Sequence, residues 1–208
     1  MKIYSALYND DAHLDVFGKL ETVYHPTQLT DTNSILILHG GADISPSIYG
    51  HKVSERTNAD EQLSTRDLSE VLLAERAIEL GIPIFGICRG AQLACALAGG
   101  SLIQHTTGHT GGNHLVATSS GDEYVSTTCH HQMMNTKDIE HELLAWSSTP
   151  LSNCYIVEDE RSITIPVEPE VVFFPKIKAI AVQGHPEWMA KDTPFVQYCL
   201  DLVKEKLL

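Results

Sequence analysis

A cysteine between two glycines, directly after a short apolar run, constrains the fold of this chain more than any other feature. The segment reads Gly86-Ile87-Cys88-Arg89-Gly90, and the apolar run before it is Ile82 to Phe85. This order is typical of a nucleophile elbow, in which a strand ends at a sharp turn and a helix begins. Glycine permits such a turn because it has no Cβ atom. We therefore expect a strand over residues 82–87 and a helix over residues 90–98.

The same placement predicts thiol chemistry at Cys88. A helix N-terminus favours negative charge, so it is expected to lower the cysteine pKa from its free value of about 8.5. The plain alternative is that Cys88 is a small buried hydrophobe, as most cysteines are. The motif alone does not decide between the two, and a nucleophile also needs a base.

A candidate base follows another apolar strand near the end of the chain. Residues Ala179 to Val182 lead into Gln183-Gly184-His185-Pro186-Glu187-Trp188. With the proline fixing the turn, Glu187 is expected to reach one ring nitrogen of His185 while the other faces Cys88. The alternative for His185 is a capping or surface role, since the chain has 11 histidines.

Four ordered motifs, from about Ile35 to Trp188, resemble the class I glutamine amidotransferase family. Two of them surround Cys88 and His185, and the others are Leu38-His39-Gly40-Gly41-Ala42-Asp43-Ile44-Ser45-Pro46 with Tyr49-Gly50, and Cys129-His130-His131-Gln132. Within that family they look most like the γ-glutamyl hydrolase branch, of the γ-glutamyl-GABA hydrolase-like kind. Arg66-Asp67, shortly before Glu70, fits the same branch.

The resemblance implies a cysteine hydrolase that cleaves a γ-glutamyl amide through a thioester, with no cofactor. Cys88, His185 and Glu187 would form its triad, and the backbone N–H groups of Gly41 and Arg89 would hold the oxyanion. The substrate would be a small γ-glutamyl molecule. Its contacts would come from Gly40, Gln92, His130, His131 and Gln132.

The chain departs from the family pattern at three positions in these motifs. His39 stands where proline is usual, Gly184 where a large residue is frequent, and Cys129 where serine is usual. Since none of them replaces a triad residue, they bear on the walls of the pocket and hence on the substrate. No paired Cys or His spacing predicts a closed zinc site, so we expect no metal.

Composition favours an ordinary enzyme over other classes. The 208 residues are 43% hydrophobic, enough for one domain spanning residues 1–208. A net charge of −13 argues against nucleic acid as a partner. No apolar run approaches the ~20 residues of a membrane helix. Five cysteines without a spacing pattern favour a reducing compartment, so we expect a cytoplasmic protein.

Apolar runs and helical patterns alternate along the chain, which predicts an α/β fold. We expect a three-layer α/β/α sandwich, flavodoxin-like, with a mainly parallel central sheet and the triad at the carboxyl ends of its strands. Predicted helices cover Leu63–Leu80 and Thr193–Leu207. Further predicted strands are Ile3–Leu7, Ser34–Leu38, Leu115–Ala117, Glu123–Ser126, Leu144–Ser147, Cys154–Val157, Val171–Phe174 and Ala179–Val182.

The sequence leaves three functions open. The first is a free-standing γ-glutamyl hydrolase. The second is a glutaminase subunit that supplies ammonia to a separate synthetase partner, and the third is a non-catalytic module on the same fold. His105, His109 and His114 either touch the substrate or, as we expect, are solvent-exposed. The leaving group and the oligomeric state are not predicted.

Overall fold

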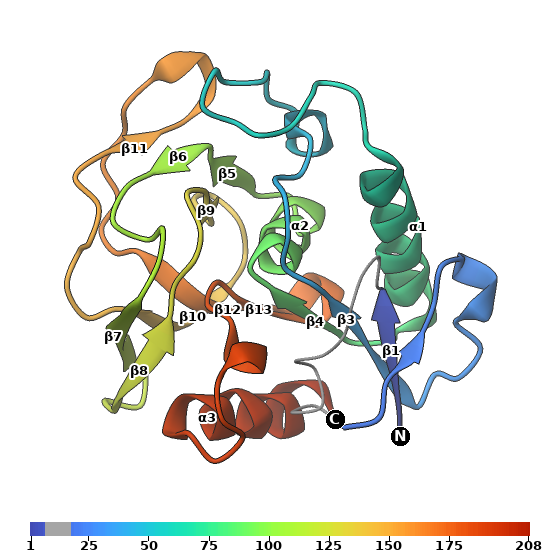
Figure 1. Ribbon diagram of the computed structural model, residues 1–208. Coiled ribbons are helices and arrows are strands. Elements are labelled where there is room, and N and C mark those ends of the chain that lie inside the picture. Colours follow the sequence, from blue (N-terminus) through green and yellow to red (C-terminus); the bar gives the residue numbers. More distant parts are fainter. Residues whose placement is uncertain (7–17) are drawn as a thin grey trace.

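A single large sheet organises the protein. The structure, a computed structural model, describes residues 1–6 and 18–208. Its sheet strands are β1 Lys2–Ala6, β2 Glu21–Thr22, β3 Ser34–Leu38, β4 Ile84–Ile87, β7 Asn113–Thr118, β8 Glu123–Thr127, β10 Glu142–Ser147, β12 Pro169–Phe174 and β13 Ala179–Val182. Within the described residues these nine strands lie in the order β2-β1-β3-β4-β13-β12-β10-β7-β8 (Figure 1). Strands β2 to β13 of that order run parallel, and β12 to β8 extend the sheet antiparallel.

Helices cover both faces of this sheet. Helices α1 (Thr65–Leu80) and α2 (Arg89–Leu97) lie on one face, and α3 (Pro194–Leu202) lies on the other (Figure 1). Strand β3 alternates between the two, since Leu36 and Leu38 join the apolar core under α1 and α2, while Ile35 and Ile37 join the core under α3. The predicted three-layer α/β fold is therefore confirmed.

The parallel strands bring the predicted motifs to one edge. Strand β3 leads into Gly40 and Gly41, β4 leads into Cys88, and β13 leads into His185. Strand β4 pairs in parallel with both β3 and β13. Because parallel strands have their carboxyl ends at the same edge, the three motifs meet there.

Helix α1 has a capping residue at each end. Ser64 caps it, and a capping box joins the Ser64 side chain to the Asp67 N–H and the Asp67 carboxylate to the Ser64 N–H. Gly81 ends it with a φ of 70°, which glycine adopts without strain. The predicted helix over Leu63–Leu80 therefore begins two residues late, because its first residues form the cap.

Most predicted strands are present, with boundaries that shift by one or two residues. The strand predicted over Ile3–Leu7 is β1, and Leu7 lies outside the described residues. The helix predicted over Thr193–Leu207 is α3, followed by a π-helical turn, Val203–Leu207. Across the part of the chain that the structure describes, no helix has the length and hydrophobicity to cross a membrane.

Short pairings beside the main sheet were not all predicted. The strand predicted over Cys154–Val157 is β11 (Tyr155–Ile156), which pairs with β6 (His105–Thr106) apart from the large sheet. Strand β5 (Ser101–Ile103) pairs with β9 (Met133–Asn135) in the same way. These strands of two or three residues are too short to show an alternating pattern in the sequence.

Candidate active site

Cys88 occupies a strained turn between β4 and α2. Its φ of 49° and ψ of −107° are unusual for a residue with a Cβ atom. The Cys88 N–H donates to the Val182 carbonyl on β13 at 2.7 Å. A Cβ atom at Gly90 would collide with the backbone of Leu38, so the helix can start this close to β3 only with glycine. The predicted elbow geometry is present.

The predicted lowering of the Cys88 pKa is wrong for this structure. Burial raises the pKa of the thiol to about 12, although a hydrogen bond from the Arg89 backbone N–H opposes the rise. Cys88 is only 5% exposed, and removing the sulfur from water penalises a thiolate more than a thiol. Cys88 therefore rests as a neutral thiol and needs a base to take its proton.

His185 is held firmly by its neighbours. Its Nδ1 lies 2.7 Å from the Glu187 carboxylate, as the sequence predicts. The imidazole stacks on Trp188 with the ring centroids 3.6 Å apart and the planes 4° from parallel. The His185 backbone N–H donates to the Thr127 hydroxyl at 2.9 Å. These contacts fix the ring and leave Nε2 as the nitrogen that can accept a proton.

Gly40 shows that Cys88 and His185 border the same small space. A Cβ atom at Gly40 would lie 2.6 Å from His185 Cε1 and 3.5 Å from the Cβ of Cys88. A side chain at this position would therefore displace the imidazole. Glycine keeps the space between Cys88 and His185 open, which is the position a reacting group would need if the two residues act together.

Both predicted oxyanion donors lie at this edge of the sheet, Gly41 in the loop after β3 and Arg89 as the first residue of α2. Gly41 has a φ of 148°, a backbone conformation that favours glycine. A hydrogen bond from the Arg89 backbone N–H lowers the pKa of Cys88, against the larger effect of burial. A Cβ atom at Gly41 would collide with the Arg66 guanidinium, which lies across the loop.

Three of the residues predicted to contact the substrate are buried and hydrogen-bonded to backbone carbonyls. The Gln92 amide donates to the Gln132 carbonyl at 3.2 Å, and the Gln132 amide donates to the Gln104 carbonyl at 3.3 Å. His130 Nδ1 lies 2.8 Å from the Gln132 carbonyl. Gln92, His130 and Gln132 are each 5% exposed or less, so they shape the wall from behind.

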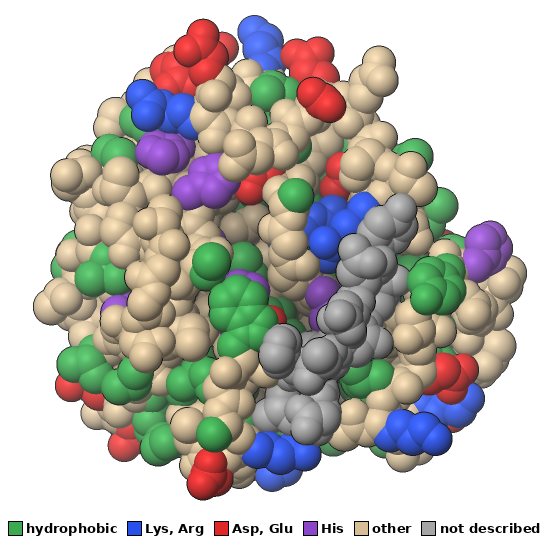
Figure 2. Space-filling view, in the orientation of Figure 1, with side chains coloured by type: hydrophobic (Ala, Val, Ile, Leu, Met, Phe, Trp, Pro, Cys, Tyr) green, Lys and Arg blue, Asp and Glu red, His purple; other side chains and the backbone are tan. Residues whose placement is uncertain are grey.

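His131 is the accessible member of this wall. Its side chain is 24% exposed, and its Nε2 lies 3.0 Å from Asp43 and 3.1 Å from the Asn58 amide. The hydrogen bond with Asp43 raises the pKa of His131, although burial opposes the rise. Figure 2 shows histidine side chains on this face beside acidic and basic ones, around a hollow near the middle of the view.

A second histidine cluster lies in the interior, where the sequence predicted exposure. His109 is fully buried, and its Nε2 lies 3.2 Å from the Glu168 carboxylate. His114 Nε2 lies 3.0 Å from Glu170. The expectation of solvent-exposed side chains is therefore wrong for His109 and also for His114, whose side chain is 5% exposed, because strands distant in sequence enclose them with carboxylates.

Part of this cluster has the composition of a metal site. Among the described residues, His109, His130 and Glu170 have donor atoms that all lie within 4.8 Å of one another. However, the rings of His109 and His130 stack 4.5 Å apart at 29°. Ring lone pairs lie in the ring plane, so nearly parallel rings direct them side by side rather than toward one centre. The predicted lack of a metal stays a prediction.

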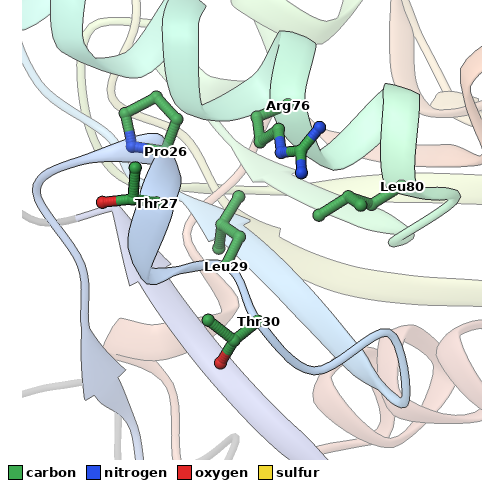
Figure 3. A pocket seen from close by; sticks show the side chains of 6 residues that line it. All are labelled: Pro26, Thr27, Leu29, Thr30, Arg76 and Leu80. Carbon is green, nitrogen blue, oxygen red and sulfur yellow. The ribbon is translucent and has the colours of Figure 1, made fainter.

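A hollow of about 500 Å³ lies at the carboxyl end of α1, away from these residues (Figure 3). It is lined by Pro26, Thr27, Leu29, Thr30, Arg76 and Leu80. Arg66, which contacts the loop beside Cys88, lies at the opposite end of the same helix. The chemistry of the side chains, and not the size of a hollow, locates the candidate site.

Thr127 and Trp188 were not singled out by the sequence, although both hold His185. Trp188 follows Glu187 directly, so its proximity was visible in the sequence, but the parallel stacking was not. Thr127 ends β8, nearly sixty positions before His185 along the chain. Only the fold brings it to the histidine.

Comparison with known proteins identifies the family of this chain. A family model described as Peptidase C26 matches residues 20–164. The chain belongs to the Peptidase C26 family. This Peptidase C26 protein is 33% identical over 119 residues to a Mycobacterium tuberculosis protein provisionally named a glutamine amidotransferase, covering 49% of this chain and 38% of that protein. The family-level part of the predicted resemblance is thus confirmed.

A second sequence relative and a solved structure are also similar to the chain. The Peptidase C26 chain is 36% identical over 64 residues to the carbamoyl phosphate synthase small chain of Buchnera aphidicola, covering 31% of this chain and 16% of that protein. The match therefore spans well under half of either relative's length. A glutamine amidotransferase structure from Thermotoga maritima aligns with a TM-score of 0.56 and 14% identity, covering 100% of this chain and 86% of that chain.

Proposed function

We propose that the protein is a cysteine hydrolase that cleaves the γ-glutamyl amide bond of a small conjugate and releases glutamate and an amine. One observation carries this proposal: a strained, buried Cys88 shares the space beside Gly40 with an imidazole that Glu187 holds in place. A nucleophile, a base and a group that orients the base are the parts that acyl transfer requires.

The first half of the proposed reaction forms a thioester. The Cys88 sulfur bonds to the amide carbon of the γ-glutamyl group while its proton passes to His185 Nε2. The carbon–nitrogen bond then breaks, and His185 returns that proton to the departing nitrogen. This order suits a thiol whose pKa burial raises, because the thiolate forms only as the base takes the proton.

The second half releases glutamate. A water molecule gives its proton to His185 and its oxygen to the thioester carbon, and the carbon–sulfur bond breaks. His185 then returns the proton to the Cys88 sulfur, so the atoms and charges balance. The backbone N–H groups of Gly41 and Arg89 are proposed to stabilise the oxyanion in both halves, and each such donor contributes about 2.7–4 kcal/mol.

We expect the two ends of the substrate to contact different sets of residues. Gly40, Gln92, His130 and Gln132 would bound the glutamyl part, since their backbone and buried side chains surround the site from behind. His131, which is accessible and paired with Asp43, would face the more variable end of the substrate. No cofactor takes part in this scheme.

The alternative is a glutaminase subunit that passes ammonia to a synthetase partner. Its support is the local similarity to a carbamoyl phosphate synthase small chain, which is one subunit of a larger enzyme by name. The chemistry at Cys88 would be the same in both cases. The two functions differ only in the substrate and in the fate of the nitrogen.

The test is glutamate release by the purified protein from a panel of γ-glutamyl amines and from free glutamine. We expect glutamate and amine in equal amounts from a conjugate, with glutamine a poor substrate. Cys88→Ala should abolish release, whereas Cys154→Ser is the matched thiol control and should retain it. Release from glutamine alone, at a slow rate that a synthetase raises, would instead support the subunit.

A further inference from the structure

Four charged side chains connect α1 and α2 behind the proposed oxyanion hole. Arg66, Asp67 and Glu70 belong to α1, and Arg89 begins α2. Asp67, Glu70 and Arg89 are at most 3% exposed, and the Arg66 side chain is 21% exposed. Buried charges are tolerated only when they are paired, and a buried ion pair is often no more stabilising than well-packed uncharged residues of the same size. The network therefore invites an explanation beyond packing.

Glu70 is the member that divides its two oxygens between the arginines. Its Oε1 accepts a hydrogen bond from Arg66 Nε at 2.8 Å, and its Oε2 accepts one from Arg89 Nη1. Asp67 accepts from Arg89 Nη2 at 2.5 Å, but its other oxygen caps α1 at Ser64. Among the described residues, the bridge between Arg66 and Arg89 therefore runs through Glu70.

Arg66 carries this bridge to the glycine loop. Its Nη2 donates to the carbonyls of His39 at 3.2 Å and Gly40 at 2.9 Å. The Gly40 carbonyl and the Gly41 N–H belong to one planar peptide group, with the two bonds pointing in opposite directions. Holding the carbonyl therefore aims the N–H.

The glycine pair makes such a hold necessary. A peptide between two glycines turns over easily, because glycine adopts positive and negative φ angles at similar cost. If the peptide between Gly40 and Gly41 turned over, its carbonyl would replace the N–H beside the reacting carbon. A carbonyl there would repel an oxyanion, whereas a fixed N–H stabilises it.

We propose that Glu70 is a positioning residue that fixes one donor of the oxyanion hole, the Gly41 N–H, through Arg66. The proposal rests on the proposed function in that it assumes acyl transfer at Cys88. It does not depend on which acyl group is transferred.

The test compares two isosteric substitutions in the same cluster. Glu70→Gln keeps the size of the side chain but turns one oxygen into an NH2 group, which cannot accept from an arginine, so one arm is lost. Asp67→Asn is the matched control, because it makes the same change beside Arg89 without touching Arg66. Arg66→Lys is a second test variant, since lysine cannot replace the fork of donors to Glu70 and the two carbonyls.

Two readouts separate positioning from folding and from substrate choice. The first is Cys88-dependent hydrolysis of p-nitrophenyl acetate, which needs an oxyanion hole but no γ-glutamyl recognition. We expect Glu70→Gln and Arg66→Lys to lower kcat about 10²-fold with little change in KM, the size of losing one oxyanion donor. The second is alkylation of Cys88 by iodoacetamide, followed by mass spectrometry of the peptide that contains Cys88 because the exposed Cys129 also reacts, and it should proceed at the wild-type rate in both variants.

Each outcome decides the proposal. Equal losses of kcat in Glu70→Gln and Asp67→Asn would assign the network to general stability and overturn it. Alkylation that slows in parallel with hydrolysis would overturn it as well, because the nucleophile would then be affected.

If Glu70→Gln does not fold, Arg66→Lys gives the answer. A wild-type protein that cleaves the ester but no γ-glutamyl compound would refute the proposed function and leave Glu70 in its role, whereas one with no Cys88-dependent cleavage of either would refute both.

Discussion

Two histidine–carboxylate pairs in this protein have similar nitrogen–oxygen distances but different surroundings. His185 lies 2.7 Å from Glu187, and His109 lies 3.2 Å from Glu168. His185 shares its space with a strained cysteine and stacks on Trp188, which is 50% exposed. His109 is fully buried and surrounded by carboxylates and other histidines. A nucleophile and access to it, rather than the pair itself, distinguish a site from a structural cluster.

The largest effect is expected when the proposed nucleophile, Cys88, or the histidine of the first pair, His185, is removed. Cys88→Ala and His185→Ala should each lower kcat by about 10⁴-fold or more, because nucleophile and base act as a unit. Steady-state release of amine from the best γ-glutamyl substrate measures the loss. The double variant should be little worse than either single one, and additive losses would contradict a shared mechanism.

Removing the carboxylate of the first pair should have the next largest effect. Glu187→Gln keeps the shape but weakens the hold on Nδ1 and the stabilisation of the imidazolium, so kcat should fall about 10²- to 10⁴-fold. Thermal unfolding of the same variant should stay close to wild type. A variant with wild-type kcat would show that Glu187 only packs beside the ring.

The buried cluster should respond in the opposite way. Glu170→Gln removes the charge that accepts from His114 Nε2 at 3.0 Å, which should lower the free energy of unfolding by about 1–3 kcal/mol. Urea denaturation measures this loss. The fall in kcat should be far smaller than in Glu187→Gln, and equal falls in kcat would erase the distinction between the two clusters.

Acid should affect the buried cluster through Glu168. Burial alone would raise the pKa of this carboxyl, but hydrogen bonds from His109, Leu151, Ser152 and Tyr155 lower it to about 2. Because the folded-state pKa lies below the usual value, the stabilisation is present above about pH 4.5 and is lost as the pH falls toward 2. Glu168→Gln should lose this part of the pH dependence in urea titrations. A variant with the wild-type acid profile would assign the effect to other carboxyls.

The sequence predicted the parts of the site that depend on local order. Cys88 between glycines and His185 followed by a proline and Glu187 each follow an apolar strand, so short-range pattern was enough. The strand before His185 was predicted with its observed boundaries, Ala179–Val182. Parallel strands with their carboxyl ends at one edge then placed the two motifs together.

What the sequence missed depends on contacts between distant residues. Nothing in the polar segment around His109 indicates that Glu168 and Glu170 will enclose it. The spacing of Arg66 and Glu70 predicts an ion pair along a helix, but their link to Arg89 needs the packing of α1 against α2. The pKa of Cys88 was predicted in the wrong direction, because the extent of burial is a property of the whole fold.

The raised pKa of Cys88 also bears on oxidative damage. Peroxides attack the thiolate, and a buried sulfur with a pKa of about 12 holds almost none of it at neutral pH. Cys88 should therefore stay reduced while the exposed thiol of Cys129, whose backbone carbonyl lies 4.0 Å from the Cys88 sulfur, reacts with the oxidant first.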